Sequence, residues 1–150
     1  MRRGIIALAA AGLLAVTGLT ACGDDGDGGS DKKPKIGVIL PDSKSSARWE
    51  TADRKYLEEA FKAAGVDSDI QNAQNDKNAF QTIADQMLTS GVTALMIVNL
   101  DSGTGKAVLD KAKNQGVPTI DYDRLTLGGS ASYYVSFDNV AVGKLQGEGL

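Results

Sequence analysis

Residues 86–101, QMLTSGVTALMIVNLD, decide the fold because they hold one complete transition from a helix to a strand. An amphipathic segment ends at Gly91, an apolar run follows at 94–98, and polar residues come directly after it. Glycine just past a helix can adopt the left-handed conformation that closes it. A continuous apolar run is typical of a strand that is buried on both faces. The stretch therefore predicts a helix, a tight turn and a buried parallel strand.

Two further helix ends carry the same pattern, AAGV at Gly65 and NQGV at Gly116. From Gly65 to Gly91 is 26 residues and from Gly91 to Gly116 is 25, which fits one helix–strand unit with short loops. Repeated units of this kind predict an α/β fold, a Rossmann-like parallel sheet with helices on both faces. We expect helices at 48–64, 76–90 and 103–115, a last helix from about Asp138, and strands at 35–40, 68–73, 94–98, 118–122 and 132–137.

The first of these helices carries an apolar face. Its members recur at helical spacing with charged residues between them, and such a stripe is expected to pack against the sheet. The stripe consists of Ala52, Tyr56, Leu57, Ala60, Phe61 and Ala64.

The N-terminal stretch MRRGIIALAAAGLLAVTGLTAC has the composition of an export signal. Two arginines precede an apolar run to Leu19, which is too short and too soon followed by polar residues to favour a transmembrane helix. The segment LTAC resembles a lipobox, the pattern of bacterial lipoproteins in which cleavage precedes a cysteine that then receives lipid. We expect a lipoprotein signal peptide at 1–21 and lipidation at Cys22. The alternative is an ordinary secreted chain with an unpaired cysteine.

Residues 22–34 are rich in glycine, aspartate and serine and have almost no apolar side chains. Such a composition cannot repay the entropy of ordering, so it predicts a flexible tether that holds the domain off a membrane. A calcium-binding loop is the alternative, because acids alternate with glycine. An EF-hand loop that starts at Asp25 would place Ile36 at its twelfth position, where a glutamate is needed.

The charge balance and the absence of histidine exclude several classes of function. The chain has 16 basic and 19 acidic residues, and removal of residues 1–21 takes away two arginines, which leaves 14 − 19 = −5. A chain with this charge has no basic surface for nucleic acid, so nucleic acid is not expected as a partner. Without histidine, the usual general base and the usual zinc ligand are missing, and we expect no metal and no cofactor.

Ligands of parallel α/β sheets bind beyond the carboxyl ends of the strands, so the strand exits are the candidate site. The segment LDSGTGKAVL resembles a phosphate-binding loop but has Leu100 and Ala107 where the Walker pattern needs glycine and serine or threonine. The first exit also has no G-x-G-x-x-G motif for a dinucleotide. A carboxylate enzyme remains an alternative, because four acids could face the same edge and two of them could act as general acid and base: Asp42, Asp101, Asp121 and Asp123.

A site for a neutral polyol explains more of these residues. Asp123 offers hydrogen-bond acceptors and Arg124 a rigid fork of donors, which suit the hydroxyls of a sugar. Trp49 is the only tryptophan, lies beside Arg48 at the end of the first exit loop, and could stack on the apolar face of a sugar ring. The alternatives are a core position for Trp49 and a surface ion pair between Asp123 and Arg124.

At these residues the sequence resembles the type I periplasmic sugar-binding proteins, and most closely their D-xylose-binding branch. The resemblance runs from about Lys35 to the end of the chain. It rests on the segments KIGVILPDSKSSARWETADRKYLEEAFKAAG, QMLTSGVTALMIVNLD, AKNQGVPTIDYDRL and YYVSFDNVAVGKLQ. In that family two Rossmann-like lobes close over one sugar, which is then passed to an ABC importer.

The resemblance implies roles for individual residues. Asp123 and Arg124 match the family's hydroxyl-binding Asp-Arg pair, Arg48 matches a basic ligand contact, and Trp49 matches the aromatic residue that stacks on the sugar. Two further candidates lie at strand exits without matching a specific contact, Asp42 and Asn99. The Phe-Asp-Asn motif that starts at Phe137 is expected to serve as helix cap and framework.

The resemblance also implies that 35–150 is an incomplete N-terminal lobe, because the family has a second lobe and this chain ends within a helix at Leu150. A site built from one lobe leaves a ligand open to water. We therefore expect this chain alone to bind sugar weakly or not at all.

The function implied is that of an extracytoplasmic, lipid-anchored binding protein and not an enzyme. It would capture a monosaccharide, D-xylose or a related aldose, for the permease of an ABC importer, and lipid on Cys22 would attach it to the cell membrane. The alternatives are a sugar-presenting sensor for a membrane receptor and a membrane-anchored hydrolase that uses the strand-exit acids. A DNA-binding regulator is excluded, because an export signal stands where its DNA-binding helices would be needed.

Overall fold

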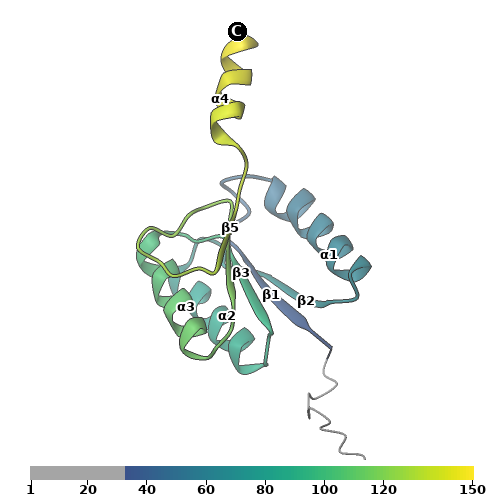
Figure 1. Cartoon of the computed structure of the whole chain (residues 1–150), viewed down its shortest axis with the longest axis vertical. Helices are drawn as coiled ribbons and strands as arrows, with labels where there is room; N and C mark the ends of the chain where they lie inside the picture. The colour runs from purple at the N-terminus through teal and green to yellow at the C-terminus, as the bar shows by residue number, and fades with distance from the viewer. Residues whose placement is uncertain (1–32) are drawn as a thin grey trace, which may run out of the picture. The chain divides into compact units, whose positions relative to one another are not determined.

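A five-stranded parallel sheet organises the residues that the computed structural model describes, 33–150 (Figure 1). Its strand order is β2-β1-β3-β4-β5, and every pair of neighbours is parallel, as the sequence predicted. The strands are β1 (Lys35–Leu40), β2 (Asp67–Asn72), β3 (Ala94–Ile97), β4 (Thr119–Tyr122) and β5 (Tyr133–Val135). The helices are η1 (Trp49–Asp53), α1 (Arg54–Ala63), α2 (Lys77–Thr89), α3 (Ser102–Asn114) and α4 (Asn139–Glu148). The predicted signal peptide at 1–21, Cys22 and all but the end of the tether at 22–34 lie outside the described residues.

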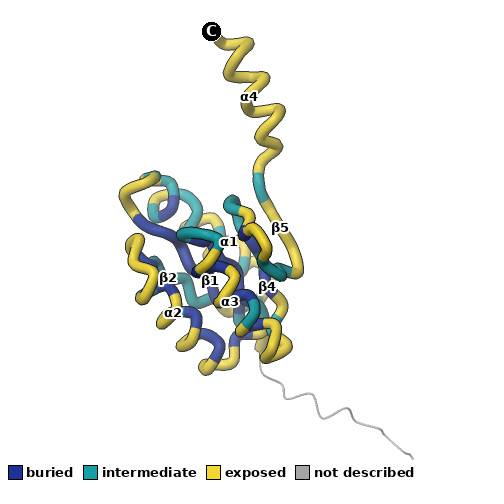
Figure 2. Tube along the Cα trace, turned by 90° about the vertical axis from the view of Figure 1, so that its left-hand side faces the viewer, coloured by how far each residue is buried: buried dark blue, intermediate teal, exposed yellow. Residues whose placement is uncertain are grey.

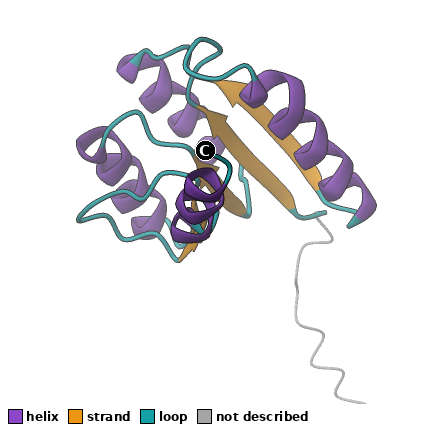
Figure 3. Ribbon diagram, turned by 90° about the horizontal axis from the view of Figure 1, so that it is seen from above, coloured by secondary structure: helices purple, strands orange, loops and turns teal. Residues whose placement is uncertain are grey.

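Helices cover both faces of the sheet, with α1 on one side and α2 and α3 on the other (Figure 3). Successive side chains of a strand point to opposite faces, so β1 divides its apolar residues between two core clusters. Ile39 packs in the cluster with α2 and α3, whereas Val38 and Leu40 pack in the cluster with η1 and α1. The continuous apolar run of β1 is therefore explained by burial on both faces.

The three glycines that punctuate the sequence close their helices as predicted. Gly65, Gly91 and Gly116 have positive φ angles of 71°, 81° and 72°. In each case the valine that follows donates its N–H to a carbonyl in the last turn of the helix, for example Val92 to Met87 O at 3.3 Å. This pairing satisfies backbone groups that the helix end would otherwise leave free.

The single helix predicted at 48–64 is wrong at its start and in part of its apolar face. The chain first makes a π-helical turn, η1, in which the N–H of Arg54 bonds to Trp49 O five residues earlier. This wider turn changes the phase of α1 relative to the spacing of a regular α-helix. Within the regular helix α1, Tyr56 is 64% exposed, and Ala60 and the C-cap residue Ala64 are exposed as well. Leu57 and Phe61, both partly buried, hold α1 on the sheet.

The last elements are less covered than the rest. The strand predicted at 132–137 is shorter, Tyr133–Val135, and all three of its residues are exposed. The helix predicted from about Asp138 is α4, and the Asp138 carboxylate accepts a hydrogen bond from the N–H of Ala141 at 2.9 Å. Every residue of α4 is exposed (Figure 2). No helix within residues 33–150 has the length and apolar character needed to cross a membrane.

The α2 face of the core should dominate stability. Phe80 is fully buried in the cluster with α2 and α3, and replacing it with alanine removes apolar contacts and leaves a cavity. We expect Phe80→Ala to lower the free energy of unfolding by about 3–5 kcal/mol in urea titrations. Tyr56→Ala is the matched control on α1 and should change it by no more than about 0.5 kcal/mol. Similar losses in the two variants would contradict this assignment of the core.

Candidate functional site

The register of the sheet brings the predicted site residues to one level at its carboxyl edge. Ile39 of β1 is paired with Ile97 of β3, which is paired with Asp121 of β4. Two residues beyond these positions stand Pro41, Asn99 and Asp123. Parallel strands place such exits at one edge, where open α/β sheets bind ligands.

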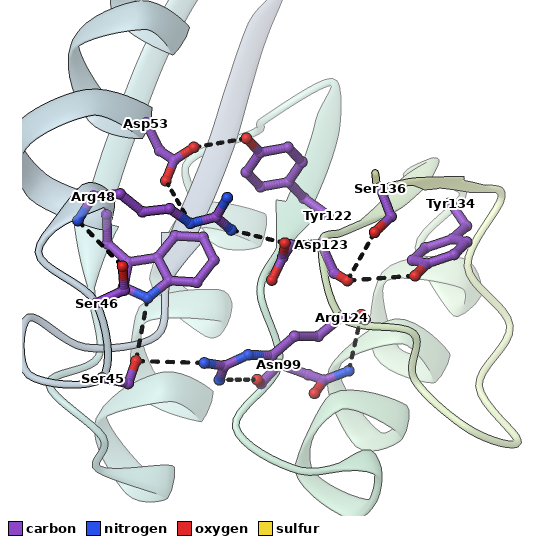
Figure 4. Close-up of polar contacts among 11 residues, drawn as sticks. Ser45, Ser46, Arg48, Asp53, Asn99, Tyr122, Asp123, Arg124, Tyr134 and Ser136 are labelled. Carbon is purple, nitrogen blue, oxygen red and sulfur yellow. Dashed lines mark hydrogen bonds and ion pairs between the residues drawn. The ribbon is translucent and has the colours of Figure 1, made fainter. Parts of the chain in front are cut away.

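Arg48 is the most connected side chain at this edge (Figure 4). One terminal guanidinium nitrogen lies 2.7 Å from Asp123 Oδ1, and Nε lies 3.4 Å from Asp53 Oδ2. The guanidinium carbon is 4.1 Å from the centre of the Trp49 ring and 5.2 Å from that of Phe137. Arg48 is therefore held by two carboxylates and two aromatic rings, with cation–π contacts adding to the ion pairs.

Arg124 contacts Asn99 and Ser45. Its two terminal nitrogens donate to Asn99 O at 3.1 Å and to Ser45 Oγ at 3.4 Å, and its guanidinium carbon is 5.6 Å from the Trp49 ring centre. The carboxylate of Asp123 pairs with Arg48 and not with Arg124. The Asp-Arg dipeptide predicted from the sequence thus belongs to a wider cluster, in which each member has a different partner.

Trp49 lies in the core, with 2% of its surface exposed. Its indole N–H donates to Ser45 Oγ at 3.2 Å, which fixes the ring beside the first exit loop. Because Arg48 lies over this ring, a ligand could stack on that face only after Arg48 moves. The structure thus brings Arg48, Trp49, Asp123 and Arg124 together while the tryptophan ring is covered.

The two further candidates, Asp42 and Asn99, support loops in this structure. Asp42 is buried and accepts hydrogen bonds from the backbone N–H groups of Lys44 and Ser45 and from the hydroxyl of Ser45. These bonds, led by the Ser45 N–H, hold the pKa of the Asp42 carboxyl below its usual value although burial opposes them. Asn99 donates its amide to Thr126 Oγ1 at 2.7 Å and to Arg124 O at 3.2 Å.

The conformation of Asp123 is unusual for a residue other than glycine. Its φ is +65°, a left-handed conformation that aspartate tolerates better than most residues. The segment after β4 holds it there, because its N–H donates to Val135 O at 2.8 Å and its carbonyl accepts from the hydroxyls of Tyr134 and Ser136. Strained conformations of this kind cluster at functional sites.

A buried polar group made of Asp121, Thr126 and Asn99 supports the exit of β4. Asp121 accepts hydrogen bonds from the N–H of Thr126 at 2.7 Å and from its hydroxyl at 2.8 Å, and the same hydroxyl accepts from Asn99. A side chain on Gly105 of α3 would approach Thr126 Oγ1 to 2.9 Å, so glycine allows this helix to pack closely. Asp121 therefore holds the loop that follows β4.

The sequence did not reveal the contacts that Ser45, Asp53 and Tyr122 make at the site. Tyr122 donates its hydroxyl to Asp53 Oδ1 at 2.8 Å, and burial together with this bond raises the pKa of Tyr122 to about 12. Asp53 stands five residues after Arg48, a spacing that does not share a face in an α-helix. Only the π-helical turn brings them together, and no local signal in the sequence announces such a turn.

A cavity of about 230 Å³ borders the site and is lined by Asp42, Lys44, Ser45, Gln74 and Asn75. Within residues 33–150 there is no cluster of three or more residues suited to hold a metal ion. The arrangement offers paired donors and acceptors along an open edge, which suits hydrogen bonding to a polar ligand.

A parallel α/β sheet with such an edge defines an α/β ligand-binding domain of the Rossmann-like class. Residues 36–150 match the family described as Periplasmic binding protein domain, and the chain belongs to this family.

Relatives with known names agree with this assignment. The chain is 39% identical to the multiple sugar-binding periplasmic protein SbpA of Azospirillum brasilense, over 77% of this chain and 32% of that protein. It is 29% identical to the D-xylose-binding periplasmic protein of Escherichia coli K12, over 79% of this chain and 36% of the relative. The chain therefore spans about a third of the length of these relatives.

A solved structure gives the same result for the fold. An ABC transporter solute binding protein from Clostridium phytofermentans, with bound β-D-glucose, superimposes with a TM-score of 0.69 at 36% identity. The match covers 76% of this chain and 35% of the other. The predicted fold class is confirmed.

The bond between Tyr122 and Asp53 should appear in the pH dependence of stability. Unfolded tyrosine loses its proton near pH 10, whereas Tyr122 in the folded chain keeps it to about 12. The stabilisation that comes from the raised pKa of Tyr122 is fully present below about pH 10 and is lost as the pH rises toward about 12. We expect the stability of the parent to fall toward that of Tyr122→Phe across this window, measured by urea unfolding.

Tyr133→Phe is the control for this measurement, because Tyr133 is 66% exposed on β5. Its stability should run parallel to that of the parent throughout the titration. A constant difference between the parent and Tyr122→Phe from pH 10 to 12 would contradict the raised pKa of Tyr122.

Proposed function

We propose that this protein is an extracytoplasmic solute-binding lipoprotein that captures a neutral monosaccharide, D-xylose or a related aldose, for an ABC importer. Residues 35–150 would form the N-terminal lobe of its sugar-binding domain. The observation that carries the proposal is the gathering of Arg48, Asp123 and Arg124 around Trp49 at the carboxyl edge of the sheet. The names of the relatives mention several sugars. They therefore support a sugar as the ligand more strongly than they support xylose in particular.

The charge of the site favours a neutral ligand. Its two guanidinium groups and three carboxylates have a formal sum of 2 − 3 = −1. A ligand that carries a carboxylate or phosphate would meet acids already present at the edge, whereas hydroxyls can accept from guanidinium and donate to carboxylate. The groups counted are those of Arg48, Arg124, Asp42, Asp53 and Asp123.

The contacts of the strand-exit acids support binding more than hydrolysis. Asp42 and Asp121 direct their oxygens to N–H and hydroxyl donors of their own loops, and Asp123 is paired with Arg48. A general acid and base pair would need two carboxyl groups free to face one substrate. We therefore propose a binding protein and not an enzyme.

Calorimetric titration with pentoses, hexoses, polyols and sugar acids tests this function on the full protein encoded by the gene, in parallel with the 150-residue chain. We expect tight binding of a neutral aldose by the full protein, weaker binding by the chain alone, and no binding of sugar acids. Arg124→Ala and Asp123→Asn should each weaken binding by about tenfold or more, because each removes a charged hydrogen-bonding group.

Lys111→Ala is the control for these variants, since Lys111 pairs with Asp85 on the α2–α3 side of the sheet and should leave affinity unchanged. Binding of a different neutral sugar would replace xylose and retain the mechanism. Failure of the full protein to bind any neutral sugar would refute the proposed function.

The lipid anchor is a separate part of the proposal. Lipidation needs the thiol of Cys22, the single cysteine of the chain, so Cys22→Ser should release the protein from the membrane fraction. Fractionation with metabolic labelling by a fatty acid measures both effects. Label that persists in Cys22→Ser, or a parent chain recovered without label in the soluble fraction, would contradict the anchor.

A further inference from the structure

Arg48 stands between two carboxylates that differ in their surroundings. The Asp53 side chain is 11% exposed and that of Asp123 is 21% exposed. Asp53 Oδ1 accepts from the Tyr122 hydroxyl at 2.8 Å, while its Oδ2 is buried and has no hydrogen-bond partner among residues 33–150. Within those residues Arg48 is the cation paired with Asp53 (Figure 4). Without Arg48, the largely buried carboxylate of Asp53 would be left as an uncompensated charge.

The two carboxylates hold different atoms of the guanidinium group. Asp53 faces Nε, next to the aliphatic stem, and Asp123 faces a terminal nitrogen. A contact at Nε fixes the direction of the stem and keeps the guanidinium plane near Trp49. A contact at the terminal nitrogen can be exchanged by a small rotation of the planar group. The geometry thus separates an inner, fixed partner from an outer, exchangeable one.

The backbone favours the same division of roles. Arg48 is the N-cap of the π-helical turn η1 and Asp53 is its last residue, and the width of this turn brings residues five apart together. Tyr122 ties Asp53 to β4, so Asp53 is held from two elements. Asp123, by contrast, lies at a strand exit in a left-handed conformation that β5 and the segment after it maintain.

We propose that Asp53 is a positioning residue that holds Arg48 over Trp49, so that Asp123 can exchange Arg48 for a hydroxyl of the ligand. The exchange of Arg48 for a ligand hydroxyl at Asp123 rests on the proposed function. The pairing of Arg48 with Asp53 is present without any ligand. In the free protein Arg48 binds both carboxylates. When a hydroxyl donates to Asp123, Arg48 stays paired with Asp53, and its terminal nitrogens can donate to ligand oxygens. No charge is left without a partner during the exchange.

The hold on Arg48 can be measured without any sugar, because Trp49 is the only tryptophan and lies 4.1 Å from the Arg48 guanidinium. Indole emission depends on the charge near the ring, and the Nε–H resonance of Arg48 in NMR spectra is sensitive to the Asp53 carboxylate 3.4 Å from Nε. Loss of this resonance in Arg48→Gln assigns it. We expect Asp53→Asn to shift both the emission and the Nε–H resonance, and Asp123→Asn to leave the Nε–H resonance in place.

Two further variants control the experiment. Glu58→Gln removes a carboxylate of α1 that pairs with Arg54 and should change neither signal. Tyr122→Phe removes the donor to Asp53 Oδ1 without altering the formal charge of Asp53, and it should shift both signals because Asp53 is no longer tied to β4. It also keeps the test decisive if Asp53→Asn fails to fold, as judged by circular dichroism. The proposal is overturned if the folded variants leave both signals unchanged, or if Asp123→Asn alone displaces the Nε–H resonance.

Sugar titration of the full protein tests the second step. Asp53→Asn should weaken binding by about tenfold or more although Asp53 touches no ligand, and Glu58→Gln should bind as the parent does. Unchanged affinity in Asp53→Asn would overturn the positioning role. A parent protein that binds no sugar would refute the proposed function, and the emission and NMR signals would still decide whether Asp53 holds Arg48.

Discussion

Parallel pairing of β1, β3 and β4 is the constraint on which the site depends. The ladder sets Ile39, Ile97 and Asp121 side by side, so the polar residues that follow each strand emerge at one level. A shift of one residue in either ladder would point these side chains to the opposite face. Burial of the strands on both faces makes such a shift costly, because apolar residues would lose their partners in both core clusters. The core therefore determines the position of residues that belong to no core cluster.

Most of the fold, and the gathering of the candidate residues at one edge of the sheet, were predictable because their signals are local. The glycines at helix ends, the apolar runs and the polar strand exits each occupy a few adjacent residues, and the structure confirms the elements they predict. The predicted start of the first helix failed because a π-helical turn precedes α1. The predicted apolar face failed in part because α1 turns Leu57 and Phe61 to the sheet and leaves Tyr56 exposed, and the stripe alone does not reveal this choice. The pairing of Asp123 with Arg48 instead of Arg124 depends on the register of β1 against β4 through β3, which no short segment encodes.

Trp49 illustrates why residue types alone give an incomplete site. A tryptophan beside an arginine at a strand exit fits both a stacking surface and a core position, and the structure gives it features of both. The ring is buried in one cluster with apolar residues of β1 and α1, and both site arginines lie within 6 Å of its centre. The same packing that stabilises the first exit loop therefore positions the cations. Stability and site geometry are coupled at this residue, so a change in the ring affects both.

The polar groups at the edge largely satisfy one another before any ligand is present. Arg48 is paired with carboxylates, Arg124 with a carbonyl and a hydroxyl, and Asp42 with its own loop. A ligand that brings a net charge would add an uncompensated group to this network. Each hydroxyl of a polyol, by contrast, is both a donor and an acceptor. Binding of such a ligand would exchange hydrogen bonds without changing the net charge of the site. The charged side chains already lose part of their hydration when the chain folds, so binding adds little to that cost. The network is thus suited to ligands that replace contacts, which is the physical basis of the proposed preference for neutral sugars.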